Sequence, residues 1–170
     1  MPRYTAIALA TVIVALPASY AGAQEFSARM TGFNETPSIL SDGSGSFTLD
    51  LDRKGRTASY TLTYSGLSSS VTQGHIHFAQ VRVAGGIIVW LCGTASNPGP
   101  SGTPTCPADG GTVTGTITAG SVVNVPAQLV AAGDFDALTD ALFANSAYAN
   151  VHTTNAPAGE IRGQIRRFDE

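Results

Sequence analysis

A strict alternation of apolar and polar residues runs through much of this chain and limits what it can fold into. In the clearest example, residues 57–64, the apolar positions are Ala58, Tyr60, Leu62 and Tyr64, and Ser or Thr stands between them. Successive side chains of a β-strand point to opposite faces, so a period of two predicts a strand with one face packed in the core and one face exposed to solvent. The chain is therefore expected to form antiparallel sheets.

Further segments of this kind are separated by clusters of Gly, Ser, Asn and Asp. They predict strands at residues 26–30, 47–51, 71–79, 87–91, 112–118, 147–153 and 160–167. The last two strands should form a terminal hairpin. The Gly- and Pro-rich residues 93–111 are expected to form a long surface loop. Gly115 falls on the inward face of its strand, where a neighbour can approach closely.

One segment breaks the period of two. Phe135, Leu138 and Leu142 recur at i, i+3 and i+7, a pattern typical of an amphipathic helix, and Asp134 is suited to cap its start. We predict one short helix at about residues 134–145, before the C-terminal hairpin. Several short strands with one inserted helix indicate an all-β fold, an immunoglobulin-like antiparallel β-sandwich or barrel.

The N-terminal residues predict export. Arg3 precedes an apolar run over residues 6–16, and Ala21-Gly22-Ala23 offers the small side chains that signal peptidase accepts. The run is shorter than the roughly 20 residues that span a bilayer. We expect residues 1–23 to be a cleaved signal peptide and residues 24–170 to be a single mature domain, secreted or periplasmic, without a membrane span.

The charge balance argues against nucleic-acid partners. Without Arg3, the mature chain keeps 8 of the 9 basic residues against 12 acidic ones, a net charge near −4 with histidine neutral. Arg166 and Arg167 form a pair rather than a basic patch, and the electrostatic footprint of a nucleic-acid binder is missing. The expected partner is an extracellular protein or a surface ligand of unknown identity.

The chain has two cysteines, Cys92 and Cys106. Export would place them where oxidation is favoured, and a disulfide between them would close a loop of about 15 residues. The alternative is two free thiols in a metal site, but neither cysteine has a second ligand at zinc-finger spacing. The disulfide is the favoured prediction.

All three histidines fall in two predicted strands: His75 and His77 in one, His152 in another. Residues i and i+2 of a strand share a face, so His75 and His77 can chelate an ion together. If the terminal hairpin lies beside their strand, His152 completes a three-nitrogen set suited to one copper or zinc ion. The alternative is a solvated polar face on which the imidazoles bond to hydroxyls such as Thr72 and Thr153.

Glu160 and Arg162 share a face of the last predicted strand. They are interpreted as an exposed ion pair, which stabilises by about 0 to 1 kcal/mol. Alternatively, Glu160 could hold a ring nitrogen of a metal-binding histidine, with Arg162 attracting an anion. The sequence contains no nucleophile elbow and no phosphate-binding glycine loop, so no catalytic residue is predicted.

The order of these motifs resembles the CHRD domain, the module repeated in chordin and found singly in bacterial secreted proteins. The matching segments are Gly32, Glu35-Thr36-Pro37, Gly74-His75-Ile76-His77, Leu91-Cys92-Gly93, Cys106-Pro107, Gly115-Thr116-Ile117, Phe135-Asp136-Ala137-Leu138, Tyr148-Ala149-Asn150-Val151-His152-Thr153 and Gly159-Glu160-Ile161-Arg162-Gly163-Gln164-Ile165. Ala158-Gly159 stands where Gly-Gly is common.

The resemblance implies an extracellular β-sandwich-like domain without enzymatic activity, acting as a binding or matrix module. A fainter likeness to copper–zinc superoxide dismutase rests on the His-x-His strand and the cysteine pair, although that enzyme needs more histidines than the three present here. The second hypothesis is therefore a mononuclear copper or zinc protein that uses His75, His77 and His152. No cofactor is certain.

Overall fold

The computed structural model describes residues 23–168. Within this range, nine strands form one sheet with antiparallel pairing, accompanied by one α-helix and three short 3-10 turns. The strands are β1 Gln24–Thr31, β2 Ser44–Asp52, β3 Thr57–Ser65, β4 Val71–Phe78, β5 Gly86–Cys92, β6 Gly111–Ile117, β7 Ala147–Thr153, β8 Ile161–Gln164 and β9 Arg166–Arg167. The prediction of an all-β fold with one helix is confirmed.

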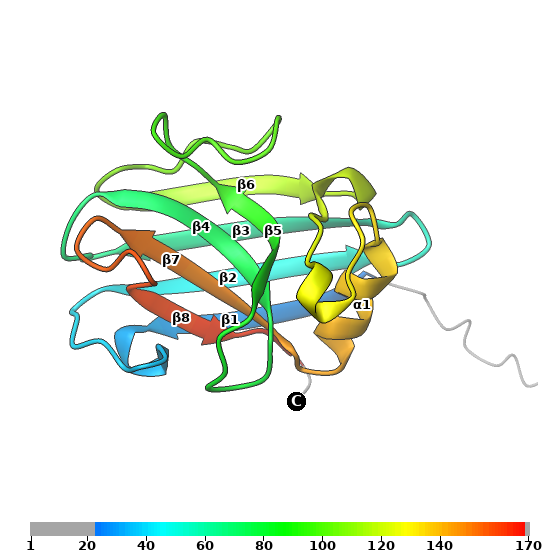
Figure 1. Cartoon of the computed structure of the whole chain (residues 1–170), viewed down its shortest axis with the longest axis horizontal. Coiled ribbons are helices and arrows are strands. Elements are labelled where there is room, and N and C mark those ends of the chain that lie inside the picture. Colours follow the sequence, from blue (N-terminus) through cyan, green and yellow to red (C-terminus); the bar gives the residue numbers. More distant parts are fainter. Residues whose placement is uncertain (1–22, 169–170) are drawn as a thin grey trace, which may run out of the picture.

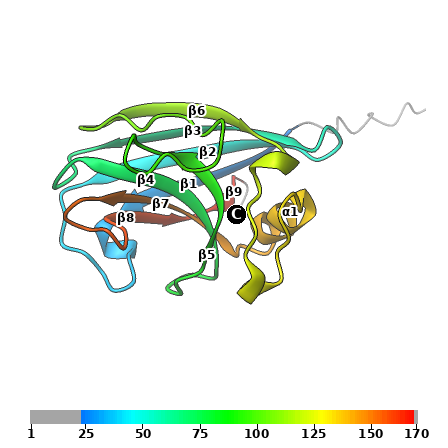
Figure 2. The same ribbon diagram turned by 45° about the horizontal axis from the view of Figure 1, so that its top comes forward.

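The sheet curves into a nearly closed barrel (Figure 1). Its strand order is β5-β4-β7-β8-β1-β2-β3-β6, and β9 pairs with β1. The predicted terminal hairpin is present as β7 and β8, in which Val151 lies opposite Ile161. The barrel stays open between β5 and β6, and we call this gap the seam. Figure 2 shows how the two ends of the sheet approach each other there.

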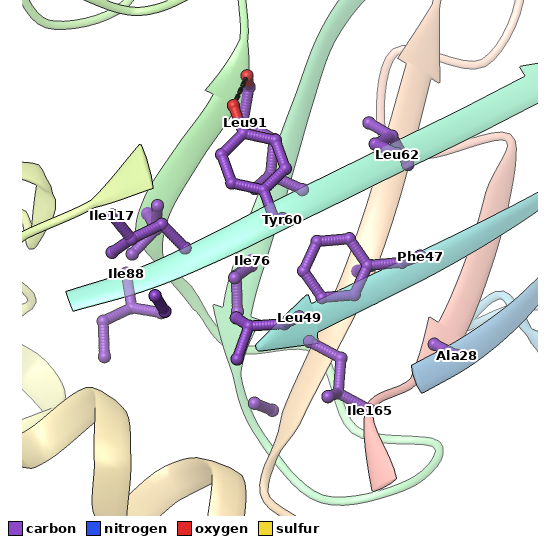
Figure 3. Close-up of a cluster of buried hydrophobic side chains, with 14 of the residues drawn as sticks. Ala28, Phe47, Leu49, Tyr60, Leu62, Ile76, Ile88, Leu91, Ile117 and Ile165 are labelled. Carbon is purple, nitrogen blue, oxygen red and sulfur yellow. Dashed lines mark hydrogen bonds between the residues drawn. The ribbon is translucent and has the colours of Figure 1, made fainter. Parts of the chain in front are cut away.

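The inward faces of the strands form the core. The alternation predicted for β3 is seen in its burial, since Ala58, Tyr60, Leu62 and Tyr64 are all buried. Figure 3 shows Tyr60 and Leu62 among the buried side chains of neighbouring strands. The hydroxyl of Tyr60 donates a hydrogen bond of 2.5 Å to the carbonyl oxygen of Leu91 on β5 (Figure 3). This bond links β3, the neighbour of the edge strand β6, to the edge strand β5.

The helix α1, Phe135–Phe143, lies at one end of the barrel (Figure 1). It is shorter than the predicted residues 134–145 because Asp134 is its cap, whose carboxylate accepts a hydrogen bond of 3.0 Å from the backbone of Ala137. Phe135, Leu138 and Leu142 are buried as the spacing predicted. The helix therefore closes the barrel end with its apolar face.

A disulfide bond joins Cys92, at the end of β5, to Cys106 in the loop before β6. The predicted pairing is confirmed. Beside it, the amide of Gly93 donates to the carbonyl oxygen of Pro104 at 2.9 Å, and the amide of Cys106 donates to that of Gly93 at 2.8 Å. The Gly- and Pro-rich loop is thereby fastened to β5 next to the seam.

Gly115 on β6 has no room for a side chain. A Cβ atom there would lie 2.6 Å from the Tyr60 hydroxyl, which is buried and already bonded to Leu91. Gly115→Ala is expected to reduce the free energy of unfolding by about 1 to 3 kcal/mol, as for other overpacked cores. Urea denaturation would measure it. Gly120→Ala is the control, because its Cβ would meet only a Thr118 hydroxyl at 3.7 Å; equal losses in both variants would contradict the prediction.

The predicted signal peptide lies outside the described residues, apart from its last residue, Ala23. It therefore stays a prediction, as does the start of the mature domain at Gln24. Within residues 23–168, the helix that is present is too short and too polar to cross a membrane.

Candidate functional site

The outer face of the barrel carries an unusual number of polar side chains over β4, β7 and β8. The strand register brings them together: His75 lies opposite Asn150, which in turn lies opposite Arg162. Because residues two apart share a face, the neighbours on each strand join the same set. Its members are His75, His77, Tyr148, Asn150, His152, Arg162 and Gln164. We call this set the polar face.

The three histidines meet on the polar face. The pairing of β4 with β7, which the sequence could only assume, places His152 beside the strand of His75 and His77. One ring nitrogen from each lies within 4.8 Å of the others. The closest pair, Nδ1 of His75 and Nε2 of His152, is 3.2 Å apart. The imidazoles are thus close enough to share a ligand.

All three imidazoles are buried, and burial favours their neutral form. Burial, together with the neighbouring imidazoles, lowers the pKa of His75 to about 2, and burial is also the main cause that lowers the pKa of His77 to about 4. Burial lowers the pKa of His152 as well. The histidines are therefore neutral at pH 7. The alternative interpretation, a solvated face, is wrong.

The partners of the ring nitrogens also differ from the hydroxyls expected on a solvated face. Nδ1 of His77 bonds to the carbonyl oxygen of Gly85 at 2.9 Å, and Nδ1 of His152 bonds to that of Pro157 at 3.1 Å. These carbonyls belong to the β4–β5 and β7–β8 loops, which fold over the outer face. The cover provided by these loops explains why polar residues on the outside of the barrel are buried.

A stack of rings continues from the histidines to Arg162. The His77 ring lies parallel to that of Tyr148, with 4.7 Å between centroids and 4° between planes. The Arg162 guanidinium lies over the Tyr148 ring, 3.4 Å from its centroid. It also donates a hydrogen bond to the carbonyl oxygen of Gln80 at 3.1 Å. Arg162 is consequently held by a cation–π contact and a loop carbonyl.

The interpretation of Glu160 and Arg162 as an exposed ion pair is wrong, because both residues are buried. The carboxylate of Glu160 instead accepts hydrogen bonds from the hydroxyls of Ser41 at 2.6 Å and Thr153 at 2.6 Å. It also accepts from the amide and hydroxyl of Ser68, at 2.7 and 2.8 Å. Burial raises the pKa of Glu160, but these bonds outweigh it and leave the pKa below its usual value. Glu160 thus ties three loops together, rather than holding an imidazole.

Glu35 belongs to the same region, although only the family motif pointed to it. Its carboxylate accepts a hydrogen bond of 2.6 Å from the Asn150 amide. Burial raises the pKa of Glu35 to about 7, against the lowering effects of Asn150 and Arg162. Asn150 and Tyr148 could have been found from the sequence, because they precede His152 by two and four positions. Glu35 lies in a loop, where periodicity gives no signal.

A groove of about 780 Å³ opens beside the polar face, between the 3-10 turn η1, Gly32–Asn34, and the β4–β5 loop. Its lining includes five arginines: Arg29, Arg82, Arg162, Arg166 and Arg167. Glu35 is the acidic residue in that lining. Phe33 and Phe168 also line it, and they are 68% and 71% exposed. We call this site the arginine groove.

The described residues 23–168 form a nearly closed antiparallel barrel with one helix, which places the chain in the class of all-β domains. The chain belongs to the CHRD domain family, whose match spans residues 26–165. No curated protein and no solved structure is significantly similar to it. CHRD domains are extracellular modules, and at that level the family supports a non-enzymatic role.

Proposed function

We propose that this domain is a non-enzymatic extracellular binding module that takes an acidic peptide segment of a partner protein in the arginine groove. One observation carries the proposal. Of the 8 basic residues in the mature chain, the groove gathers 5, although the chain as a whole is acidic. Concentrated positive potential in a cleft attracts anionic ligands and speeds their association.

The rest of the lining favours a peptide over a purely anionic polymer. Phe33, Val81 and Phe168 expose apolar surface beside the arginines. Exposed aromatic residues next to arginine are typical of protein-binding surfaces. A volume of about 780 Å³ is also within the usual range for ligand pockets. A short segment that alternates carboxylates with apolar side chains would satisfy both parts of the lining.

The test is fluorescence anisotropy with a labelled octapeptide of alternating Glu and Phe. The expected result is binding that weakens with salt, and that weakens by at least about 10-fold in Arg29→Gln/Arg82→Gln, because both arginines are exposed in the groove. The matched control is Arg53→Gln/Lys54→Gln, which removes two exposed charges from the β2–β3 turn outside the groove.

Two outcomes would contradict the proposal: the peptide does not bind, or the control variant weakens peptide binding as much as the groove variant does. If the peptide fails to bind while heparin binds through the groove, the groove is assigned to an acidic polysaccharide. Circular dichroism of each variant would establish that the barrel is intact.

A further inference from the structure

The three histidines of the polar face carry a second inference, independent of the arginine groove. One hydrogen bond joins His75 to His152, but the hydrogen bonds of the cluster do not satisfy all of its ring nitrogens. In the part of the chain that the structure describes, Nε2 of His75 and Nε2 of His77 are buried without a hydrogen-bond partner. Buried polar atoms in folded proteins are nearly always paired, so two unpaired nitrogens side by side call for an explanation.

Two of the imidazoles are already oriented for metal binding. A carbonyl oxygen can only accept a hydrogen bond, so Gly85 and Pro157 fix the protons of His77 and His152 on Nδ1. The lone pair of each ring is then on Nε2. Metal-binding histidines are held in this manner, by a carbonyl or carboxylate on the nitrogen that does not bind the ion.

The spacing of the nitrogens also fits one ion. Two nitrogens bound tetrahedrally at about 2.05 Å lie about 3.3 Å apart. Nδ1 of His75 and Nε2 of His152 are 3.2 Å apart, and the whole set lies within 4.8 Å. In the metal-free protein this short contact is a hydrogen bond that His75 donates to the lone pair of His152, so binding through Nδ1 requires the proton of His75 to move to its Nε2. Small side-chain rotations would bring the third nitrogen to bonding distance.

We infer that His75, His77 and His152 form a mononuclear site for copper(II) or zinc(II), bound by three imidazole nitrogens with one position open. Neutral imidazole suits these ions, whereas calcium and magnesium require oxygen ligands. Both cysteines are in the disulfide and do not compete for the ion. On the usual affinity order of divalent ions, copper is expected to bind more tightly than zinc.

The experiment uses residues 24–170 without a histidine tag, stripped with chelator and titrated calorimetrically with copper(II) or zinc(II) at pH 7.5. We expect one ion per chain, with Kd below about 1 μM. Electron paramagnetic resonance of the copper form should show hyperfine coupling to nitrogen. His77→Ala and His152→Ala are each expected to weaken binding by at least about 100-fold, since even the loss of an outer partner weakens metal sites by about 10- to 100-fold.

The control is Thr63→Ala on β3, where the hydroxyl bonds to that of Thr112 at 3.0 Å and does not belong to the ligand set. Its Kd should equal that of the parent. If His77→Ala does not fold, His77→Gln replaces it. The hyperfine coupling to nitrogen in the copper form of the parent protein tests imidazole binding without any variant. Absence of uptake of either ion, copper coordinated by oxygen alone, or unchanged affinity in both histidine variants would overturn the inference.

Discussion

Acidification of the metal-free protein from pH 6.5 to pH 4.5 is expected to destabilise it by at least about 2 kcal/mol. His75 and His77 have pKa values of about 2 and 4 in the fold, against 6.5 for an ordinary histidine. Across this range the unfolded chain therefore binds more protons than the folded chain, so the free energy of unfolding decreases as the pH falls. Each such proton contributes about 1.4 kcal/mol per pH unit.

Two other groups modify this slope. His152, with a lowered pKa, adds to the acid destabilisation. Glu35 opposes it, because its pKa is raised from 4.5 to about 7, and the folded chain holds its proton more tightly than the unfolded chain. His75 and His77 leave about two extra protons on the unfolded chain and Glu35 offsets about one, so the balance is at least about one proton, or about 1.4 kcal/mol per pH unit.

Urea denaturation in the presence of chelator, at pH 7, 6 and 5, measures this effect. Glu35→Gln is the informative variant, because it keeps an oxygen for the Asn150 amide and removes the opposing proton. It should steepen the acid dependence, and at pH 8 it should be more stable than the parent by up to about 3 kcal/mol. Stability that stays flat between pH 7 and pH 5 in both proteins would show that the imidazoles ionise within the fold.

Loss of the disulfide between Cys92 and Cys106 is expected to reduce the free energy of unfolding by about 3 kcal/mol. The bond closes a loop with a sequence separation of 14, and the chain-entropy model gives this value for a loop of that size. Since Cys92 is completely buried, replacing it with alanine should add a smaller loss from packing.

The measurement compares urea midpoints with and without a phosphine reductant, alongside the double variant Cys92→Ala/Cys106→Ala. Reductant should destabilise the parent and leave the double variant unchanged. Thr103→Ala is a control inside the same loop, where an exposed hydroxyl bonds only to the nearby Pro100 carbonyl. A reduced parent as stable as the oxidised one would mean that the hydrogen bonds at Gly93 hold the loop by themselves.

Local patterns predicted most of the fold. The alternation in β3 and the i, i+3, i+7 spacing in α1 indicate which face of a single element is buried, and the structure confirms both predictions. The sequence did not contain the order of strands around the barrel. His75 and His152 are 77 positions apart, and only the pairing of β4 with β7 brings them together.

The candidate site was harder to predict, for a physical reason. The alternation of a strand predicts that polar residues on its outer side are exposed to solvent, and it predicts an exposed ion pair for Glu160 and Arg162. In this protein, loops cover that side, and the same residues become buried anchors for the loops. Periodicity cannot reveal a covering loop, because loop residues such as Glu35 carry no periodic signal of their own.

The seam also affects chains in which the disulfide has not formed. In the described residues, no ladder of hydrogen bonds joins β5 to β6. An isolated bridge between Val89 and Val122 covers part of the open side of β5, whereas β6 leaves one side without a partner strand. Unpaired strand sides invite pairing with another copy of the chain. The disulfide holds the Gly- and Pro-rich loop beside this opening. Reduced chains should therefore self-associate and aggregate more readily than oxidised ones at equal concentration, quite apart from their lower stability.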